Sequence, residues 1–136
     1  MAVITRVKAR SVSPPGYEVN DKGQAKVALV AGDLLIMTAD TPSAGHERVW
    51  DKAETGTTEA HGIALMDCAA GRTADVGIMG EMDGWSGMVP GTALYPSGTT
   101  AAALDDTART IATTPAVPLP VRIRAVTPTR IRYNFT

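Results

Sequence analysis

The sequence predicts an all-β fold: a small single-domain β-barrel or sandwich, of the jelly-roll or β-tulip kind, with short strands, long loops and paired terminal strands. Apolar and polar residues alternate over short runs, Gly, Pro, Asp or Ser break these runs roughly every eight to twelve residues, and helical periodicity is nearly absent. A chain of 136 residues can form one domain with a modest core. We therefore expect one domain over residues 1–136, in which 1–16 form an extended N-terminal strand or arm.

The first half of the chain predicts short strands separated by turns. In the first strand, residues 4–12, Arg6, Lys8 and Arg10 share one face because successive side chains of a strand alternate. Two prolines and a glycine within residues 13–16 end this strand. The polar segments 20–23 and 31–33 predict turns, and the remaining strands of this half are 25–30, 34–38 and, inside a polar loop of residues 39–60, 48–53.

The second half predicts two hairpins. The first joins strands 61–69 and 73–79. Residues 80–91 are rich in glycine and predict turns, 92–95 form a short strand, and 101–109 is the one segment whose composition allows a helical turn. The last hairpin joins 119–126 and 130–135 at a tight reversal, and its alternation separates the apolar residues from four arginines: Arg122, Arg124, Arg130 and Arg132.

Composition bounds the class of protein. Only 4% of the residues are aromatic, so we expect a small core whose stability would gain from association with another surface. The single cysteine, Cys68, excludes an internal disulfide framework. The early charges do not fit a signal peptide, and no run approaches the roughly 18 apolar residues of a membrane span. We expect a soluble protein made in the cytoplasm, with no membrane partner.

Charge is strongly segregated along the chain, although the net charge is only −1. Residues 1–30 carry five basic and two acidic groups, residues 31–106 carry three and twelve, and residues 107–136 carry five and none. An acidic middle between two basic ends predicts either that the chain pairs its own charges on folding, or that it presents opposite charges to different neighbours.

The sequence offers no convincing catalytic or metal-binding set. Ser86 lies in the string GWSG, in which the second glycine comes one residue too early for a nucleophile elbow, and both histidines precede it; we interpret it as a turn residue. His61 and Asp67 would lie roughly 20 Å apart on one strand, with Cys68 on the opposite face, so the three would not converge on a metal ion. We expect neither enzymatic activity nor a cofactor.

Two groups of residues are candidates for contact with a partner. The first is a basic face of the terminal strands: Arg6, Lys8, Arg10, Arg122, Arg124, Arg130 and Arg132. It would bind an acidic surface, or its arginines are solvated or paired within the chain; it lacks the aromatic residues that stack on bases, so we expect no direct contact with nucleic acid. The second is a soft apolar cluster, which either plugs one end of the barrel or contacts another chain: Met79, Met82, Trp85 and Met88.

Residues 30–34, VAGDL, and residues 61–97, HGIALMDCAAGRTADVGIMGEMDGWSGMVPGTALYPS, resemble the capsid cement (decoration) proteins of tailed bacteriophages. The matching pattern is AGD followed by apolar residues, a GIAL strand, an AAG turn, a V-x-I-x-G strand and a PG-x-x-LY element. It covers about residues 27–97, and the arginine-rich strands fit as the last pair. The polar segment 39–60 and the proline-rich break after the first strand depart from this pattern and leave the capsid-contacting arm unassigned.

The resemblance implies a structural protein of the virion, without catalytic residues or a cofactor. It implies a homo-oligomer, dimer or trimer, that binds the major capsid protein on the outer surface of the bacteriophage head and stabilises the capsid by bridging neighbouring subunits. The N-terminal strand or the arginine-lined tail would dock on the shell. The alternative function is a carbohydrate- or ligand-binding β-barrel used in host attachment, with Trp50, Trp85 and the tyrosines as its aromatic surfaces.

Overall fold

The computed structural model describes residues 4–55, 59–108, 110–111, 117–118 and 120–136. This part of the chain is all-β, as the sequence predicts, and contains no helix, so no described helix could span a membrane. Its strands are β1 (Thr5–Ser11), β2 (Val19–Ala25), β3 (Leu34–Met37), β4 (Val49–Lys52), β5 (Gly62–Ala64), β6 (Thr73–Ser86), β7 (Ala93–Pro96), β8 (Leu104–Asp105), β9 (Thr110–Ile111), β10 (Val117–Pro118), β11 (Ile123–Ala125) and β12 (Arg130–Asn134).

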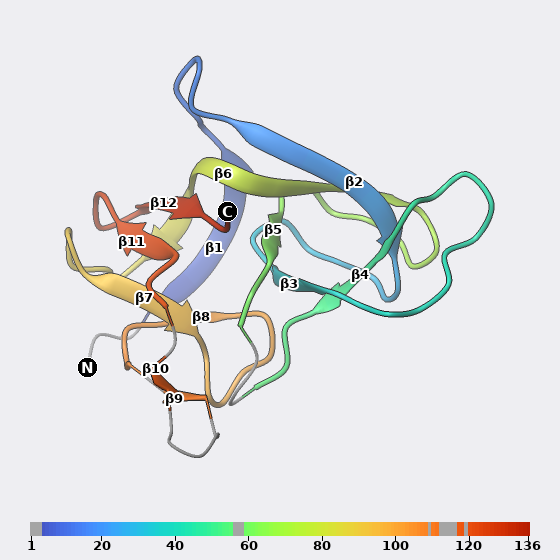
Figure 1. Cartoon of the computed structure of the whole chain (residues 1–136). Helices are drawn as coiled ribbons and strands as arrows, with labels where there is room; N and C mark the ends of the chain where they lie inside the picture. Colours follow the sequence, from blue (N-terminus) through green and yellow to red (C-terminus); the bar gives the residue numbers. More distant parts are fainter. Residues whose placement is uncertain (1–3, 56–58, 109, 112–116, 119) are drawn as a thin grey trace.

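The 14-residue strand β6 organises the sheet and runs across the molecule in Figure 1. Its first half pairs with β2 and β5, and its second half pairs with β1 on one edge and β12 on the other. From β12 the sheet continues through β11 and β7 to β8, which makes ten strands in all, while β9 and β10 form a separate pair. We expected the terminal strands to pair with each other, and this was wrong: β1 and β12 each pair with β6 instead.

Five strands, including the first half of β6, form a closed ring. The hydrogen-bonded order is β2, β4, β3, β5, β6 and back to β2, with the β2–β4 pair parallel. Trp50 lies fully buried inside the ring, against Gly23 and Gly62, where an added Cβ would come within 2.5 Å and 3.3 Å of the indole. Trp50 is the largest side chain of this small interior, which it shares with smaller apolar residues such as Leu35 and Val76. The remaining strands form an open extension, so the molecule is neither one simple barrel nor a two-sheet sandwich.

A second core lies under β1, β12, β11 and β7. Its centre is Tyr133, which is fully buried and packs beside Phe135 with ring centroids 5.7 Å apart. The phenol lies directly on β6, where a Cβ on Gly77 or Gly80 would come within 2.4 Å and 2.7 Å of the Tyr133 oxygen. Burial raises the pKa of this phenol, so it packs as a neutral group.

Several expected strands are confirmed, with ends that shift by one residue. They are 4–12, 34–38, 48–53, 92–95 and 130–135, which correspond to β1, β3, β4, β7 and β12. Residues 5–11 form an integral strand of the sheet and not a free arm. The strand expected at 119–126 is shorter, since β11 covers Ile123–Ala125, and Leu119 lies outside the described residues.

Five expectations were wrong, because tertiary contacts override local preferences. Residues 20–23 are not a turn but part of β2, which β4 and β6 pair from both edges. Residues 80–86 continue β6 and are not turns, and β5 ends at Ala64, well before residue 69. The strand expected at 25–30 is only a bridge between Leu29 and Cys68. The segment 101–109 holds the short strand β8 and no helical turn in its described part.

Gly84 explains the glycine-rich string within β6. The register pairs Arg6 with Trp85 and Arg10 with Asp83, so three residues of β1 stand opposite Gly84 alone and form a bulge. Gly84 has φ = +116°, and a Cβ there would lie 2.0 Å from the carbonyl oxygen of Lys8. Only glycine allows both this backbone angle and the close approach of β1.

We predict that Gly84→Ala lowers the free energy of unfolding by about 3 kcal/mol, because it combines backbone strain with a backbone clash. Urea denaturation of the purified protein measures this change. Gly16→Ala is the matched control, since Gly16 also has positive φ (+82°) but nothing lies within 4 Å of an added Cβ. Equal losses in the two variants would contradict the proposed packing of β1 on Gly84.

Candidate functional site

The basic ends of the chain are neutralised mainly by its acidic middle. Of the ten ion pairs among the described residues, seven join a basic residue of 1–30 or 107–136 to an acidic residue of 31–106. Of the two outcomes that segregated charge allows, the structure therefore shows the first: the chain pairs its own charges. Most of the arginines expected to form an open cationic face are committed to internal contacts.

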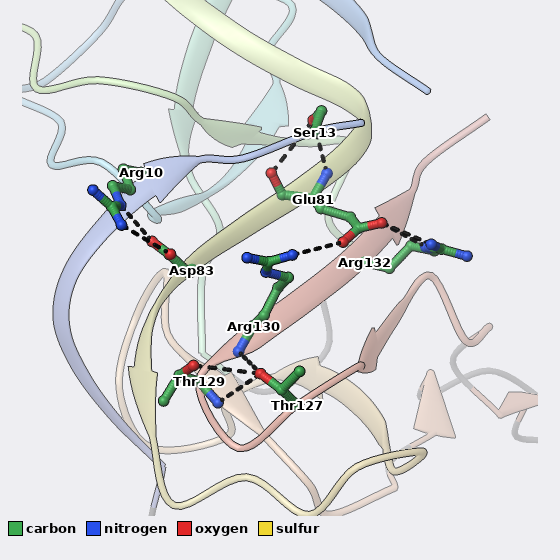
Figure 2. Close-up of polar contacts among 8 residues, drawn as sticks. All are labelled: Arg10, Ser13, Glu81, Asp83, Thr127, Thr129, Arg130 and Arg132. Atoms are coloured by element: carbon green, nitrogen blue, oxygen red, sulfur yellow. Dashed lines mark hydrogen bonds and ion pairs between the residues drawn. The ribbon is translucent and has the colours of Figure 1, made fainter. Parts of the chain in front are cut away.

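Glu81 is the centre of an ion-pair network with two arginines of β12 (Figure 2). Its side chain is 3% exposed, and its Oε2 accepts hydrogen bonds from Nε and Nη2 of Arg132 at 3.1 Å and 2.7 Å. Nη1 of Arg130 lies 3.9 Å from Oε1. The backbone of Glu81 is held as well, because its N–H donates to Ser13 Oγ at 2.9 Å and its carbonyl accepts from the N–H of Val12 at 3.0 Å. One residue thus joins the segment that follows β1 to strands β6 and β12.

Arg132 is also held from outside the sheet. Its guanidinium carbon lies 4.9 Å from the centroid of the Tyr17 ring, within the range of a cation–π contact. The hydrogen bonds to Glu81, followed by the charge of that carboxylate, raise the pKa of Arg132. This arginine is therefore a permanent cation with a fixed geometry, although 53% of its side chain is exposed.

The two arginines of β1 behave alike. Arg10 forms two hydrogen bonds to Asp83, at 2.9 Å and 3.3 Å, and these raise its pKa. Arg6 lies 2.7 Å from Asp33, whose side chain is 2% exposed. Asp33 also accepts the N–H of Val30 at 2.8 Å, which closes the turn of the AGD motif. Lys8 lies in the bulge of β1, outside the regular strand ladder, and is exposed.

A groove lies over the C-terminal hairpin, and we call it the hairpin groove. Its volume is about 320 Å³, and it is lined by Tyr17, Gly91, residues 121–126 and residues 132–134. Arg122 lies at one side, where it bonds Glu59 at 3.0 Å and 3.2 Å and the carbonyl of Thr136 at 2.9 Å. Arg124 faces outward, directly opposite Arg132 in the register, and its Nη1 donates only to the carbonyl of Gly91 at 3.2 Å.

Three basic side chains of the described residues have no carboxylate partner: Lys8, Arg72 and Arg124. Arg124 is the only such residue in the hairpin groove, and Lys8 lies at a different surface, beside the bulge of β1. Two valines that line the hairpin groove, Val121 and Val126, are 43% and 40% exposed. The groove therefore combines an unneutralised cation with exposed apolar surface.

The apolar cluster of methionine and tryptophan is largely internal. Met82, Trp85 and Met88 are 0%, 3% and 4% exposed and belong to the second core, while Met79 is half-buried. In this conformation the four do not form an exposed contact patch, because Met82, Trp85 and Met88 pack into the second core. The other interpretation, that they plug the interior, agrees with their burial.

The remaining polar candidates do not converge. Ser86 is the exposed last residue of β6, paired with Thr5, and is not in a turn. His61 Nδ1 accepts the N–H of Met37 at 3.0 Å. The Cys68 thiol contacts the carbonyls of residues 69 and 73, and burial raises its pKa. Among the described residues no group of three or more His, Cys, Asp or Glu side chains could hold a metal ion.

Sequence reasoning found Arg122, Arg124 and Arg132 but missed the other walls of the hairpin groove. Tyr17 lies far from these residues in the chain, and only the folded sheet brings it over Arg132. Comparison of the chain with protein-family models, with curated proteins and with solved structures gives no match.

We predict that Glu81→Gln lowers the free energy of unfolding by about 2 kcal/mol. The substitution removes the buried negative charge that pairs with Arg130 and Arg132. Asp83→Asn is the matched control on the same strand. Its partner Arg10 is 75% exposed, so the loss there should be under about 1 kcal/mol. Urea denaturation of both variants gives the comparison, and a larger loss in Asp83→Asn would show that Glu81 is not the main link.

Proposed function

We propose that the protein is a decoration protein of a tailed-bacteriophage head. In this proposal it binds the outer surface of the icosahedral shell as a homo-oligomer and bridges neighbouring copies of the major capsid protein. The resemblance of residues 27–97 to capsid cement proteins supports the proposed class of protein. The surface chemistry of the hairpin groove supports the proposed position of the contact with the shell.

The residues that carry the resemblance have connected structural roles. The AGD turn at 31–33 is fixed by the buried Asp33, and the GIAL string contains β5, which pairs with β3 and β6. Gly77 and Gly80 of the V-x-I-x-G string make room for Tyr133, and the PG-x-x-LY string leads into β7. The motif thus describes one framework around β6, which supports treating the resemblance as more than a set of isolated turns.

The observation that carries the docking surface is Arg124. It is the only cation of the hairpin groove without a carboxylate, and exposed valines lie on the same surface. A partner that fits would bring a carboxylate and an apolar residue together. We infer that an acidic patch on the outer face of the major capsid protein binds here, and that other arginines of the groove hold its shape through internal pairs.

No observation favours the carbohydrate-binding alternative. A sugar-binding surface uses exposed aromatic rings, but Trp50 and Trp85 are 0% and 3% exposed, and Tyr133 is fully buried. These three rings fill the two cores of the molecule. Tyr17, Tyr95 and Phe135 are partly buried, Tyr17 lies against the guanidinium of Arg132, and Phe135 stacks beside Tyr133.

We predict that heads assembled without this protein release their DNA at a lower temperature than complete heads, because the bridges across subunit seams are missing. Addition of the purified protein should restore the original temperature. A DNA-binding dye that reports release during a temperature ramp measures both. Equal release temperatures with and without the protein would contradict a stabilising role.

We predict that Arg124→Glu weakens binding to such heads by about tenfold or more, equivalent to about 1.4 kcal/mol, with less dependence on salt than the native protein. The measurement is co-sedimentation of purified protein with heads across a range of salt concentrations. Arg72→Glu is the matched control, because Arg72 is also exposed and lacks a carboxylate partner among the described residues but does not line the hairpin groove. Unchanged occupancy for Arg124→Glu would exclude the hairpin groove as the docking surface.

A further inference from the structure

A second and larger groove lies beside β1, and we call it the β1 groove. Its volume is about 600 Å³. One wall is residues 6–9 of β1, and the other is formed by two loops, residues 30–31 and 65–67. It shares no lining residue with the hairpin groove, so the two surfaces are separate candidates for contact with a partner.

Exposed apolar side chains are concentrated in the β1 groove. Val7, Met66 and Val30 are 75%, 58% and 49% exposed, and they are three of the four most exposed large apolar residues in the described part of the chain. Single exposed apolar residues are normal, but several in one groove mark a contact surface. Methionine and valine on both walls suit a protein surface that packs against them.

The backbone of β1 at this groove does not favour addition of a strand. The bulge of β1 places Val7 and Lys8 outside the regular ladder, and such bulges interrupt pairing along a strand edge. Close packing fixes the bulge, since an added Cβ on Gly84 would lie 2.0 Å from the Lys8 carbonyl, and one on Gly32 would lie 2.7 Å from the Ala9 Cβ. A partner would therefore contact side chains that are already positioned.

The β1 groove is lined by charges of both signs. Lys8 on the β1 wall has no carboxylate partner, and Asp67 on the loop wall forms no ion pair with any described residue, although its Oδ1 accepts the N–H of Ala31 at 3.0 Å. Arg6 is already paired with the buried Asp33. The lining of one groove thus includes a cation and an anion that form no ion pair with any described residue, together with exposed apolar side chains.

We propose that the β1 groove is an isologous interface with a second copy of this chain. In a two-fold dimer the same patch meets itself, so Lys8 of each copy faces Asp67 of the other while Val7 and Met66 pack between them. An acidic or basic partner would leave one of the two charges without a counterpart, whereas a second copy satisfies both. This proposal concerns the free protein and does not depend on the capsid.

The experiment is sedimentation equilibrium of the full chain. We expect the native protein to have twice the mass of the chain, and Lys8→Glu and Asp67→Lys each to raise the dimer dissociation constant at least tenfold, because each places like charges together. The double variant Lys8→Glu/Asp67→Lys should restore the dimer, since the pairs re-form with reversed polarity. Both residues are exposed, so circular dichroism should show an unchanged fold.

Arg72→Glu serves as the control for a change of net charge and should leave the dimer intact. A monomeric native protein, a mass three times that of the chain, or single variants that dimerise like the native protein would each overturn the proposal. Failure of the double variant to recover would do so as well. Head binding is measured separately with Arg124→Glu, so failure of the dimer and failure of capsid binding give different results.

Discussion

The fold depends on several elements that pack closely against the backbone of strand β6. β6 carries glycines where other elements touch its backbone: Gly77 and Gly80 lie under the buried phenol of Tyr133, and Gly84 lies under the bulge of β1. Each glycine removes a side chain that would hold the neighbour away, so β6 can pair with β2 and β5 at one end and with β1 and β12 at the other. A chain with few aromatic residues gains stability in this way, because each large ring is packed directly against backbone and leaves little empty space.

Ion pairs add to the stabilisation that packing provides. The acidic residues that neutralise the basic ends are not simply exposed, since Asp33 and Glu81 are 2% and 3% exposed and each is approached by two basic side chains. A buried carboxylate without such partners would be costly, so the terminal strands are required to satisfy the middle of the chain. The basic ends therefore have a structural role. Among the described residues, the basic side chains that remain available for a partner are the few without a carboxylate: Lys8, Arg72 and Arg124.

The sequence predicted the fold class and most strand positions because these follow from local alternation, as in β12, where Ile131 and Tyr133 are buried and Arg132 is exposed. It also predicted the arginines of the hairpin groove. It could not show that Gly23, Gly80 and Gly84 lie within strands, because a glycine in a turn and a glycine under a distant side chain look the same in one sequence. For the same reason it could not tell an exposed methionine cluster from a buried one, or an open arginine from one paired with a residue 51 positions away, as Arg132 is with Glu81.

The two proposed contacts, dimerisation through the β1 groove and shell binding through the hairpin groove, are compatible with each other. Because they share no residue, a dimer formed through the β1 groove would still present two hairpin grooves, one from each copy. Each hairpin groove offers one free cation and a modest apolar surface, which is consistent with a weak single contact. Two linked contacts on a repeating shell would bind much more tightly than either alone, since the second forms at a high effective concentration. In this proposal a small protein binds a repeating shell without a large interface on any one copy.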